Sequence, residues 1–201
     1  MRHERPFESP THGGRSDCRA TITHGPGPIF VTICTRDSES LFGTVIAKHV
    51  HLSVPGQAAR MCWLEIPEHF VNVTLDAFII MPDHLHGIVI ITDTLDRNSV
   101  EATDTLDRNS VGAQHAAPLQ HIGRSRLPVG SAGPAQGSLG AIVRGFKSAA
   151  TKRINEMRHM PGKPVWQRNY YDRIIRDDRE MQRARQYVLL NPARWKGAAE
   201  H

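Results

Sequence analysis

Short runs of apolar residues, separated by polar and turn-forming stretches, predict the order of elements along the chain. The run from Ile29 to Cys34 (IFVTIC) combines β-branched and aromatic side chains, which favours a buried strand. From Gln57 to Phe70 apolar residues follow a Pro-Gly turn at helical spacing, at positions 58, 61, 62, 64 and 66. This spacing predicts one packed helix after the first strand.

Two further strand-like runs lie close together in the sequence. Val73 to Met81 and His84 to Ile91 are separated by Pro82 and Asp83, a pair that favours a turn and does not continue a strand. The two runs together predict a β-hairpin. The second run, HLHGIVII, is apolar on both faces after Gly87, so we expect it to be a central strand.

A different kind of sequence follows this hairpin. The segment TDTLDRNSV occurs at residues 92–100 and again at 103–111, and a stretch rich in Gly, Ala, Pro and Gln comes after it. Two copies are too few for a solenoid, which needs about three stacked repeats to bury a core. We therefore expect residues 92–137 to be a low-complexity loop insertion in a single domain at 29–196, preceded by a flexible tail at 1–28.

Helical spacing returns in the last third of the chain. Apolar residues recur from Leu139 to Met157 with basic residues between them, which predicts an amphipathic basic helix. Val165 to Ile175 contains a possible short edge strand. Asp177 and Glu180 then form a D-x-x-E capping pattern that opens a final helix, and we expect Pro192 to end it.

Charge is unevenly distributed along the chain. The net charge is +5, but residues 139–196 hold 14 Lys or Arg against 5 Asp or Glu, which leaves 11 against 15 for the rest. A concentration of this kind is what a phosphate backbone requires of its partner. A solvated helix surface explains the charge equally well.

Two features that the sequence lacks indicate the cellular compartment of the protein. No apolar run approaches the ~18 residues of a membrane span, and the polar start lacks a signal-peptide core, so no membrane association is expected. Cys18, Cys34 and Cys62 are odd in number and far apart, which argues against a disulfide framework and a cysteine zinc site. We expect a cytoplasmic protein.

His84 and His86 are the strongest candidates for metal ligands. Side chains at i and i+2 of a strand share a face, so the two imidazoles could meet on one metal ion while Leu85 enters the core. The chain holds 12 histidines, and His49-Val50-His51 repeats the pattern, so one of the two is expected to be chance. We favour 84 and 86, because they begin an apolar strand directly after a tight turn.

Tyr187 and Asn191 lie four residues apart, in what is expected to be the last turn of the final helix. They share a face beside the apolar stripe of Met181, Ala184 and Val188, and that face should lie on the sheet. A tyrosine hydroxyl can attack phosphorus, and an asparagine carbonyl oxygen can serve as a third metal ligand. Taken alone, these residues favour ordinary packing and a helix terminus.

Four stretches carry a resemblance to a known family: FVTICTRDSESLFG, LDAFIIMPDHLHGIVII, LGAIVRGFKSAATKRIN and VWQRNYYDRIIRDDREMQRARQYVLLNPARW. They resemble the REP-associated tyrosine transposases of the HUH single-strand transposase superfamily, which use one catalytic tyrosine. The resemblance covers most of residues 28–196, and the motifs occur in the family's order. It implies an α+β fold with a ferredoxin-like (RRM-like) antiparallel sheet, helices packed on one side and a C-terminal helix carrying the tyrosine.

The same resemblance implies a site and a reaction. Magnesium or manganese would be held by His84, His86 and Asn191, and Tyr187 would attack single-stranded DNA next to hairpins, the family's repetitive extragenic palindromes (REP). The product would be a 5′-phosphotyrosine link and a free 3′-hydroxyl. No nucleotide cofactor is expected, because the covalent link conserves the phosphodiester energy. The sequence leaves open whether the protein is a monomer or a homodimer.

Several alternatives remain open at this level. Tyr170 and Tyr171 are rival nucleophiles. A non-catalytic nucleic-acid-binding module would need exposed aromatic residues on its central strands, and HLHGIVII has none. A metal-dependent nuclease that uses metal-bound water would leave nicked DNA without covalently bound protein. Six basic residues are expected to contact DNA: Arg144, Lys147, Lys152, Arg168, Arg173 and Arg176. About half of them should touch phosphate, and the others should form a solvated face.

Overall fold

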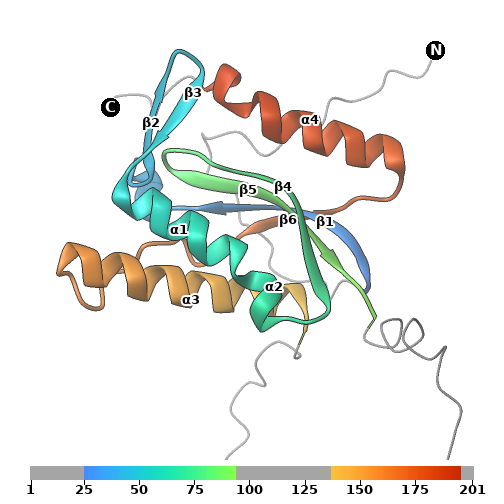
Figure 1. Cartoon of the computed structure of the whole chain (residues 1–201), viewed down its shortest axis with the longest axis horizontal. Coiled ribbons are helices and arrows are strands. Elements are labelled where there is room, and N and C mark those ends of the chain that lie inside the picture. The colour runs from blue at the N-terminus through green and yellow to red at the C-terminus, as the bar shows by residue number, and fades with distance from the viewer. Residues whose placement is uncertain (1–24, 94–136, 196–201) are drawn as a thin grey trace, which may run out of the picture.

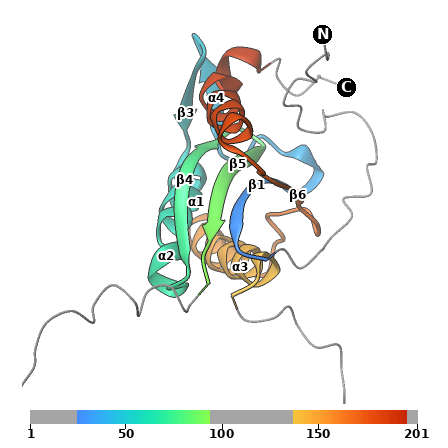
Figure 2. The ribbon, with the colours of Figure 1, turned by 90° about the vertical axis from the view of Figure 1, so that its right-hand side faces the viewer.

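The protein is built in three layers around one antiparallel sheet. The structure, a computed structural model, describes residues 25–93 and 137–195. Three helices cover one face of the sheet and a fourth lies across the other face (Figures 1 and 2). The sheet has the order β4-β5-β1-β6 and is formed by β1 (Gly27–Cys34), β4 (Val73–Ile80), β5 (His84–Ile91) and β6 (Tyr171–Ile174). This order is that of a ferredoxin-like sheet, as expected.

The helices fall between these strands in the order β1-α-β4-β5-α-β6. The predicted hairpin, the central position of β5, the edge position of the last strand and the basic helix are all confirmed. A separate two-stranded hairpin, which the sequence did not indicate, follows a 3-10 turn, η1 (Arg36–Ser38). The remaining elements are β2 (Gly43–Ile46), β3 (His49–Leu52), α1 (Val54–Leu64), α2 (Ile66–His69), α3 (Leu139–Arg158) and α4 (Asp178–Arg194).

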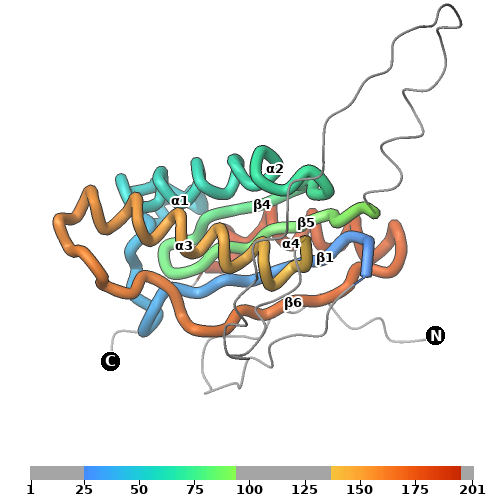
Figure 3. The backbone as a smooth tube through the Cα atoms, turned by 90° about the horizontal axis from the view of Figure 1, so that it is seen from below, coloured from blue at the N-terminus to red at the C-terminus, as the bar shows by residue number. Residues whose placement is uncertain are grey.

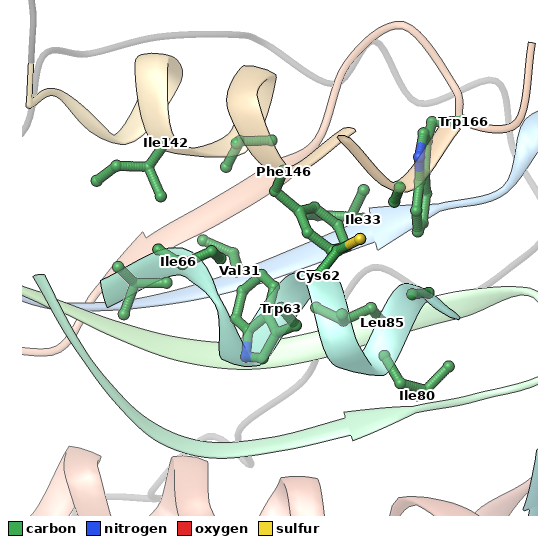
Figure 4. Packing of buried hydrophobic residues seen from close by; sticks show 14 of the residues in the cluster. Val31, Ile33, Cys62, Trp63, Ile66, Ile80, Leu85, Ile142, Phe146 and Trp166 are labelled. Atoms are coloured by element: carbon green, nitrogen blue, oxygen red, sulfur yellow. The ribbon is translucent and has the colours of Figure 1, made fainter. Parts of the chain in front are cut away.

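The main core lies between the sheet and the layer of α1, α2 and α3. Trp63 and Phe146 meet edge to face, with ring centroids 5.2 Å apart, and both are buried over Val31 and the neighbouring strands (Figure 4). Gly87 makes this packing possible, because a Cβ there would fall 2.4 Å from Trp63 Cζ2. Only glycine lets the indole lie directly on β5.

A smaller apolar cluster fixes α4 to the opposite face. Its buried members are Phe30, Ile88, Ile175, Ala184 and Val188. Two ion pairs at the margins of the helix add to this packing. Arg185 donates two hydrogen bonds to Asp76 of β4, at 2.8 and 2.7 Å, and Arg173 of β6 donates one to Glu180 at 3.0 Å. The helix is therefore held along its length, which fixes the direction of its sheet-facing side chains.

The single helix expected over residues 57–70 is wrong. The helix begins earlier, at Val54, where the Ser53 hydroxyl accepts a hydrogen bond from the Gly56 N–H. It is interrupted at Glu65, because the ring of Pro67 cannot share a helix with the carbonyl of the residue four positions earlier. Met61 and Leu64, placed by the sequence on the packed face, are 49% and 40% exposed.

The expected end of the last helix at Pro192 is also wrong. The Asp177 cap is confirmed, since its carboxylate accepts from the Glu180 N–H at 2.7 Å, but the helix runs on to Arg194. Pro192 lies inside the helix, as the third residue from its end. Tyr187 therefore lies about two turns before the helix terminus and not in its last turn.

The ends of the expected insertion meet at one residue. Asn72 accepts a backbone hydrogen bond from Thr92 at 2.9 Å, and its side chain donates to the Gly137 carbonyl at 3.5 Å. Residues 94–136 and 1–24 lie outside the described residues, so the repeat and the tail stay predictions. The first strand begins at Gly27, inside the stretch 1–28 assigned to the tail. None of the described helices has the length and apolar character needed to cross a membrane.

Candidate active site

Two buried histidines stand side by side at the start of β5. His84 and His86 are 3% and 2% exposed, and their Nε2 atoms lie 3.0 Å apart. Leu85 between them is fully buried on the other face of the sheet, in the main core. The strand alternation therefore places the two imidazoles together under α4, as the sequence indicated.

Each imidazole is held from behind by a second group. His84 Nδ1 contacts Asp83 Oδ1 at 2.5 Å, and His86 Nδ1 contacts Thr32 Oγ1 at 2.9 Å. An ionised carboxylate only accepts, so His84 donates from Nδ1 and its Nε2 faces His86. The Thr32 hydroxyl can donate or accept, so His86 can likewise carry its proton on Nδ1 and leave Nε2 for a ligand. Asp83 and Thr32 thus orient the two rings from behind.

One face of α4 covers the histidine pair. The Tyr187 ring meets His86 edge to face at 5.2 Å between centroids, and the Trp195 ring lies 5.7 Å from that of His84. Asn191 sits on the same helix face, one turn from each aromatic residue, and is 7% exposed. The fold thus brings together the two strand histidines and the tyrosine, and it buries Asn191 on the same face of α4.

The donor set fits a divalent cation on chemical grounds. Histidines that bind metal commonly use one ring nitrogen for the ion and the other for a carboxylate or hydroxyl, which is the arrangement of Asp83 and Thr32. Among the described residues no group of three His, Cys, Asp or Glu side chains is placed to hold a metal. A metal at this position would therefore draw on His84, His86 and the amide oxygen of Asn191, with oxygens of a substrate completing its coordination.

Tyr170 lies away from the histidine pair. It packs against the main core on the side of α3, where the Lys147 ammonium lies 5.8 Å from its ring centroid. Burial, and in second place the charge of Asp172, raise the pKa of the Tyr170 hydroxyl to about 12. The side chain is thus both on the wrong face and poorly suited to ionise.

Tyr171 remains a rival. It pairs with Thr32 across β6 and β1, and Thr32 pairs with His86 across β1 and β5. Residues directly opposite one another in antiparallel strands point to the same face. Tyr171 therefore shares the histidine face, two strands away from His86.

The second histidine pair lies elsewhere. His49 and His51 are exposed on β3, in the separate two-stranded sheet, and His49 Nδ1 is hydrogen-bonded to the Ala47 carbonyl at 2.8 Å. This pair has neither the burial nor the carboxylate and hydroxyl partners found at 84 and 86.

The six basic residues expected to contact DNA divide between two faces. Arg173 and Arg176 lie on β6 and the turn leading to α4, and the others lie on α3 or in the segment after it. Two are engaged within the protein. Lys147 Nζ donates to the carbonyls of Gln167 and Asn169, each at 2.9 Å, and Arg173 pairs with Glu180. Exposed side chains are left at Arg144, Lys152, Arg168 and Arg176.

Four residues of the site had not been identified from the sequence. Thr32 and Asp83 orient the histidines, Trp195 covers His84, and the Arg194 guanidinium lies 5.9 Å from the Tyr187 ring centroid. Asp83 could have been found from its place beside His84. Thr32 could not, because only the register of β1 against β5 brings it opposite His86.

Comparisons with known proteins give one relative and a shared fold. No protein-family model matches the chain. An uncharacterized protein of Haemophilus influenzae (strain ATCC 51907 / DSM 11121 / KW20 / Rd) is 35% identical over 170 residues, which cover 85% of this chain and 82% of the relative. Among solved structures, a REP-associated tyrosine transposase bound to a REP hairpin matches 88% of this chain and 72% of its own, at 13% identity and a TM-score of 0.51.

A second solved structure is more distant. A protein of Deinococcus radiodurans R1, provisionally assigned as a transposase, matches 85% of this chain and 94% of its own at 12% identity, with a TM-score of 0.42. At these identities the likeness to the hairpin-bound structure concerns the fold, and the second similarity is too low to add to it.

Proposed function

The chain belongs to one family with the Haemophilus influenzae protein and has the fold of the REP-associated tyrosine transposase, and from this premise we propose that it is a DNA transposase. It cleaves and rejoins single-stranded DNA next to hairpins, with Tyr187 as nucleophile. The observation that carries the proposal is the packing of the Tyr187 ring on His86, within a buried histidine pair that two further side chains orient.

The reaction needs one bond formed and one broken. The Tyr187 oxygen loses its proton and bonds to the scissile phosphorus, while the bond from phosphorus to the 3′-oxygen breaks and that oxygen leaves as a hydroxyl. The product is a 5′-phosphotyrosine. Because the new ester conserves the energy of the old one, a free 3′-hydroxyl can attack it and restore Tyr187, with no nucleotide cofactor.

A divalent cation fits the site beside this tyrosine. Mg²⁺ or Mn²⁺ bound by His84, His86 and Asn191 would supply charge stabilisation at the scissile phosphate. The chain itself orients the two imidazoles and encloses them beneath Tyr187 and Trp195. This enclosure limits the access of water, which favours strand transfer over hydrolysis of the covalent link.

The hairpin is proposed as the substrate because the transposase structure that shares the fold is bound to a REP hairpin. A non-catalytic nucleic-acid-binding module on the same fold is less well supported. Such modules bind bases on the open face of the sheet, and here α4 covers that face and buries Phe30.

The decisive variant is Tyr187→Phe. Phenylalanine keeps the ring that packs on His86 and Phe30 and removes only the hydroxyl, so the fold should be retained. Wild-type protein mixed with hairpin-tailed single-stranded DNA and Mg²⁺ should give a protein-DNA band on a denaturing gel. The variant should give no such band and should still bind the hairpin in a native gel.

Tyr171→Phe is the matched control. It removes a hydroxyl on the same face of the sheet and should leave the covalent band unchanged. A band that persists in Tyr187→Phe and disappears in Tyr171→Phe would move the nucleophile to β6. Nicked DNA with no covalently bound protein, from the wild type, would support the metal-dependent nuclease.

A further inference from the structure

A pocket of about 830 Å³ lies between α3 and the segment that follows it, on the face of the sheet away from the histidine pair. We name it the α3 groove and define it by Arg144, Lys152, Asn155, Lys163 and Trp166, which line it. Figure 3 shows α3 running along this face, with the chain after it turning back toward β6. The volume is within the ~300–1,000 Å³ of pockets that bind small organic groups.

The α3 groove is positively charged. Four basic side chains line it, against the single carboxylate of Glu156. Lys147 Nζ already donates hydrogen bonds to the backbone carbonyls of Gln167 and Asn169, and these bonds hold the wall of the groove in place. The side chains of Arg144, Lys152 and Lys163 have no ion pair or hydrogen bond within residues 25–93 and 137–195. Three cations along one pocket, none of them paired with an acidic side chain of the described residues, make a site for an anion such as a phosphate.

Two residues that line the α3 groove each have a buried polar atom without a hydrogen-bond partner among the described residues. Asn155 and Trp166 are 5% and 7% exposed; Asn155 Nδ2 donates to the Lys163 carbonyl, but Asn155 Oδ1 and Trp166 Nε1 have no hydrogen bond to the described protein. Buried polar atoms are ordinarily paired, so an acceptor and a donor without protein partners beside one pocket are available to a ligand. Both atoms are shielded from solvent, so a neighbouring part of the pocket wall must shift for a ligand to reach them.

The α3 groove and the histidine pair lie at the same end of the sheet, on opposite faces. The Gln167 N–H donates to the Cys34 carbonyl at 2.9 Å, and Trp166 forms a β-bridge with Thr35. Cys34 is the partner of His84 in the ladder of β1 and β5. Only the end of β1 thus lies between the two sites. A flexible DNA strand that passes round this end can contact both.

We propose that the α3 groove binds one unpaired nucleotide of the DNA substrate, away from the cleavage site. The phosphate lies among Arg144, Lys152 and Lys163, and the edge of the base, which offers a donor and an acceptor, pairs with Asn155 Oδ1 and Trp166 Nε1. The choice of DNA as ligand rests on the proposed function, whereas the site itself rests on the pocket, its charge and its unpaired atoms.

The charge of the groove is tested first. The probe is a fluorescein-labelled DNA hairpin with a thymidine tail on each side, and binding is followed by anisotropy in EDTA, where cleavage does not occur. Lys152→Ala with Lys163→Ala should bind about tenfold more weakly, with a salt dependence shallower by about 1.4 on a double-logarithmic plot. The control, Lys48→Ala with Arg60→Ala, removes two exposed charges elsewhere and should change affinity by less than about twofold. An equal loss in both variants would overturn the proposal.

The base contact is tested by replacing one tail nucleotide at a time with an abasic site. At one position the replacement should weaken binding to the wild type by about tenfold, the effect expected when a base contact is lost. The same replacement should have a clearly smaller effect on Trp166→Phe, which keeps an aromatic ring and lacks the N–H, because only the contact with Asn155 is then left to lose. If no position is sensitive, or if the sensitive position stays fully sensitive in Trp166→Phe, the nucleotide site is wrong.

These measurements are independent of the chemistry at Tyr187. A covalent adduct together with equal losses in the two double variants would leave the proposed function standing and overturn the groove. Loss of affinity only in the Lys152 and Lys163 variant, without any adduct, would support the groove and reject the transposase reaction.

Discussion

At the scale of single residues, the site depends on side chains that never need to touch DNA. Asp83 and Thr32 bond the outer nitrogens of the two histidines and so fix the direction in which the inner nitrogens point. Such outer partners raise the basicity of the ligand and set its tautomer. The pair at 49 and 51 has no carboxylate or hydroxyl partner of this kind and lies exposed on β3.

This contrast gives a prediction on metal binding. His84→Ala should lower the affinity for Mn²⁺, measured by calorimetry, by at least about 100-fold, and should abolish DNA cleavage. His49→Ala should leave both unchanged, because its side chain lies exposed on β3. Equal loss of Mn²⁺ affinity in the two variants, with both shown to be folded by circular dichroism, would contradict the assignment of the metal site.

Some residues of the site could be predicted from the sequence and others could not. The spacing of His84 and His86 on a strand, and of Tyr187 and Asn191 on a helix, could be recognised because each pair belongs to one element. Thr32 and Tyr171 could not be placed, since their position beside the histidines depends on the register of β1 against two other strands. Tyr170 was ruled out as the nucleophile by its burial. The burial of one side chain depends on the whole fold, so it could not be predicted from the sequence.

At the scale of elements, the site requires α4 to lie at a fixed rotation over the sheet. The Asp76–Arg185 pair contributes to this rotation from a position two residues before Tyr187. The hydrogen bonds from Arg185 lower the pKa of the Asp76 carboxyl. A carboxyl with a lowered pKa stabilises the fold above its unfolded pKa of ~3.9, and this stabilisation is lost as pH falls through the folded pKa.

Asp76→Asn should therefore reduce the free energy of unfolding in urea by about 1 kcal/mol at pH 7, a value limited by the partial exposure of Arg185. The deficit should hold down to about pH 5 and shrink below about pH 4, because the wild-type carboxyl is then protonated too. Glu68→Gln, an exposed site on α2, is the control and should show no such pattern. A deficit that does not change with pH would show that the pair acts through packing and not through charge.

Element boundaries were less predictable than the elements themselves. Two prolines show this. Pro67 follows the break at Glu65 and lies at the start of the short helix α2, whereas Pro192 lies inside α4, as the third residue from its end. Each proline falls near the end of an apolar pattern, so sequence spacing alone does not distinguish an interrupted helix from one that accommodates the proline.

At the scale of the whole molecule, the two helical layers have different roles. The layer of α1, α2 and α3 forms the main core and carries the α3 groove, and α4 closes the other face over the histidines (Figure 2). The order of strands could be expected from the resemblance to a family. The placement of α4 on the opposite face follows from the side on which Phe30 and Ile88 point, which the pairing of strands determines.

The insertion provides a test of this architecture. Both of its ends bond to Asn72, so a linker of about six residues can replace residues 94–136 without moving β5 or α3. Loop closure becomes less costly with a roughly sevenfold shorter loop, so the variant should be about 1–2 kcal/mol more stable in urea unfolding. A marked loss of stability would mean that the deleted residues belong to the core.

The central claim is that Tyr187 becomes joined to DNA. Wild-type protein should be incubated with hairpin-tailed single-stranded DNA and Mg²⁺, treated with nuclease and protease, and examined by mass spectrometry for a peptide that carries a nucleotide. We predict one modified peptide, from α4, with the phosphate on Tyr187 and linked to a 5′-oxygen. A modification on Tyr171, or cleaved DNA without any modified peptide, would contradict it.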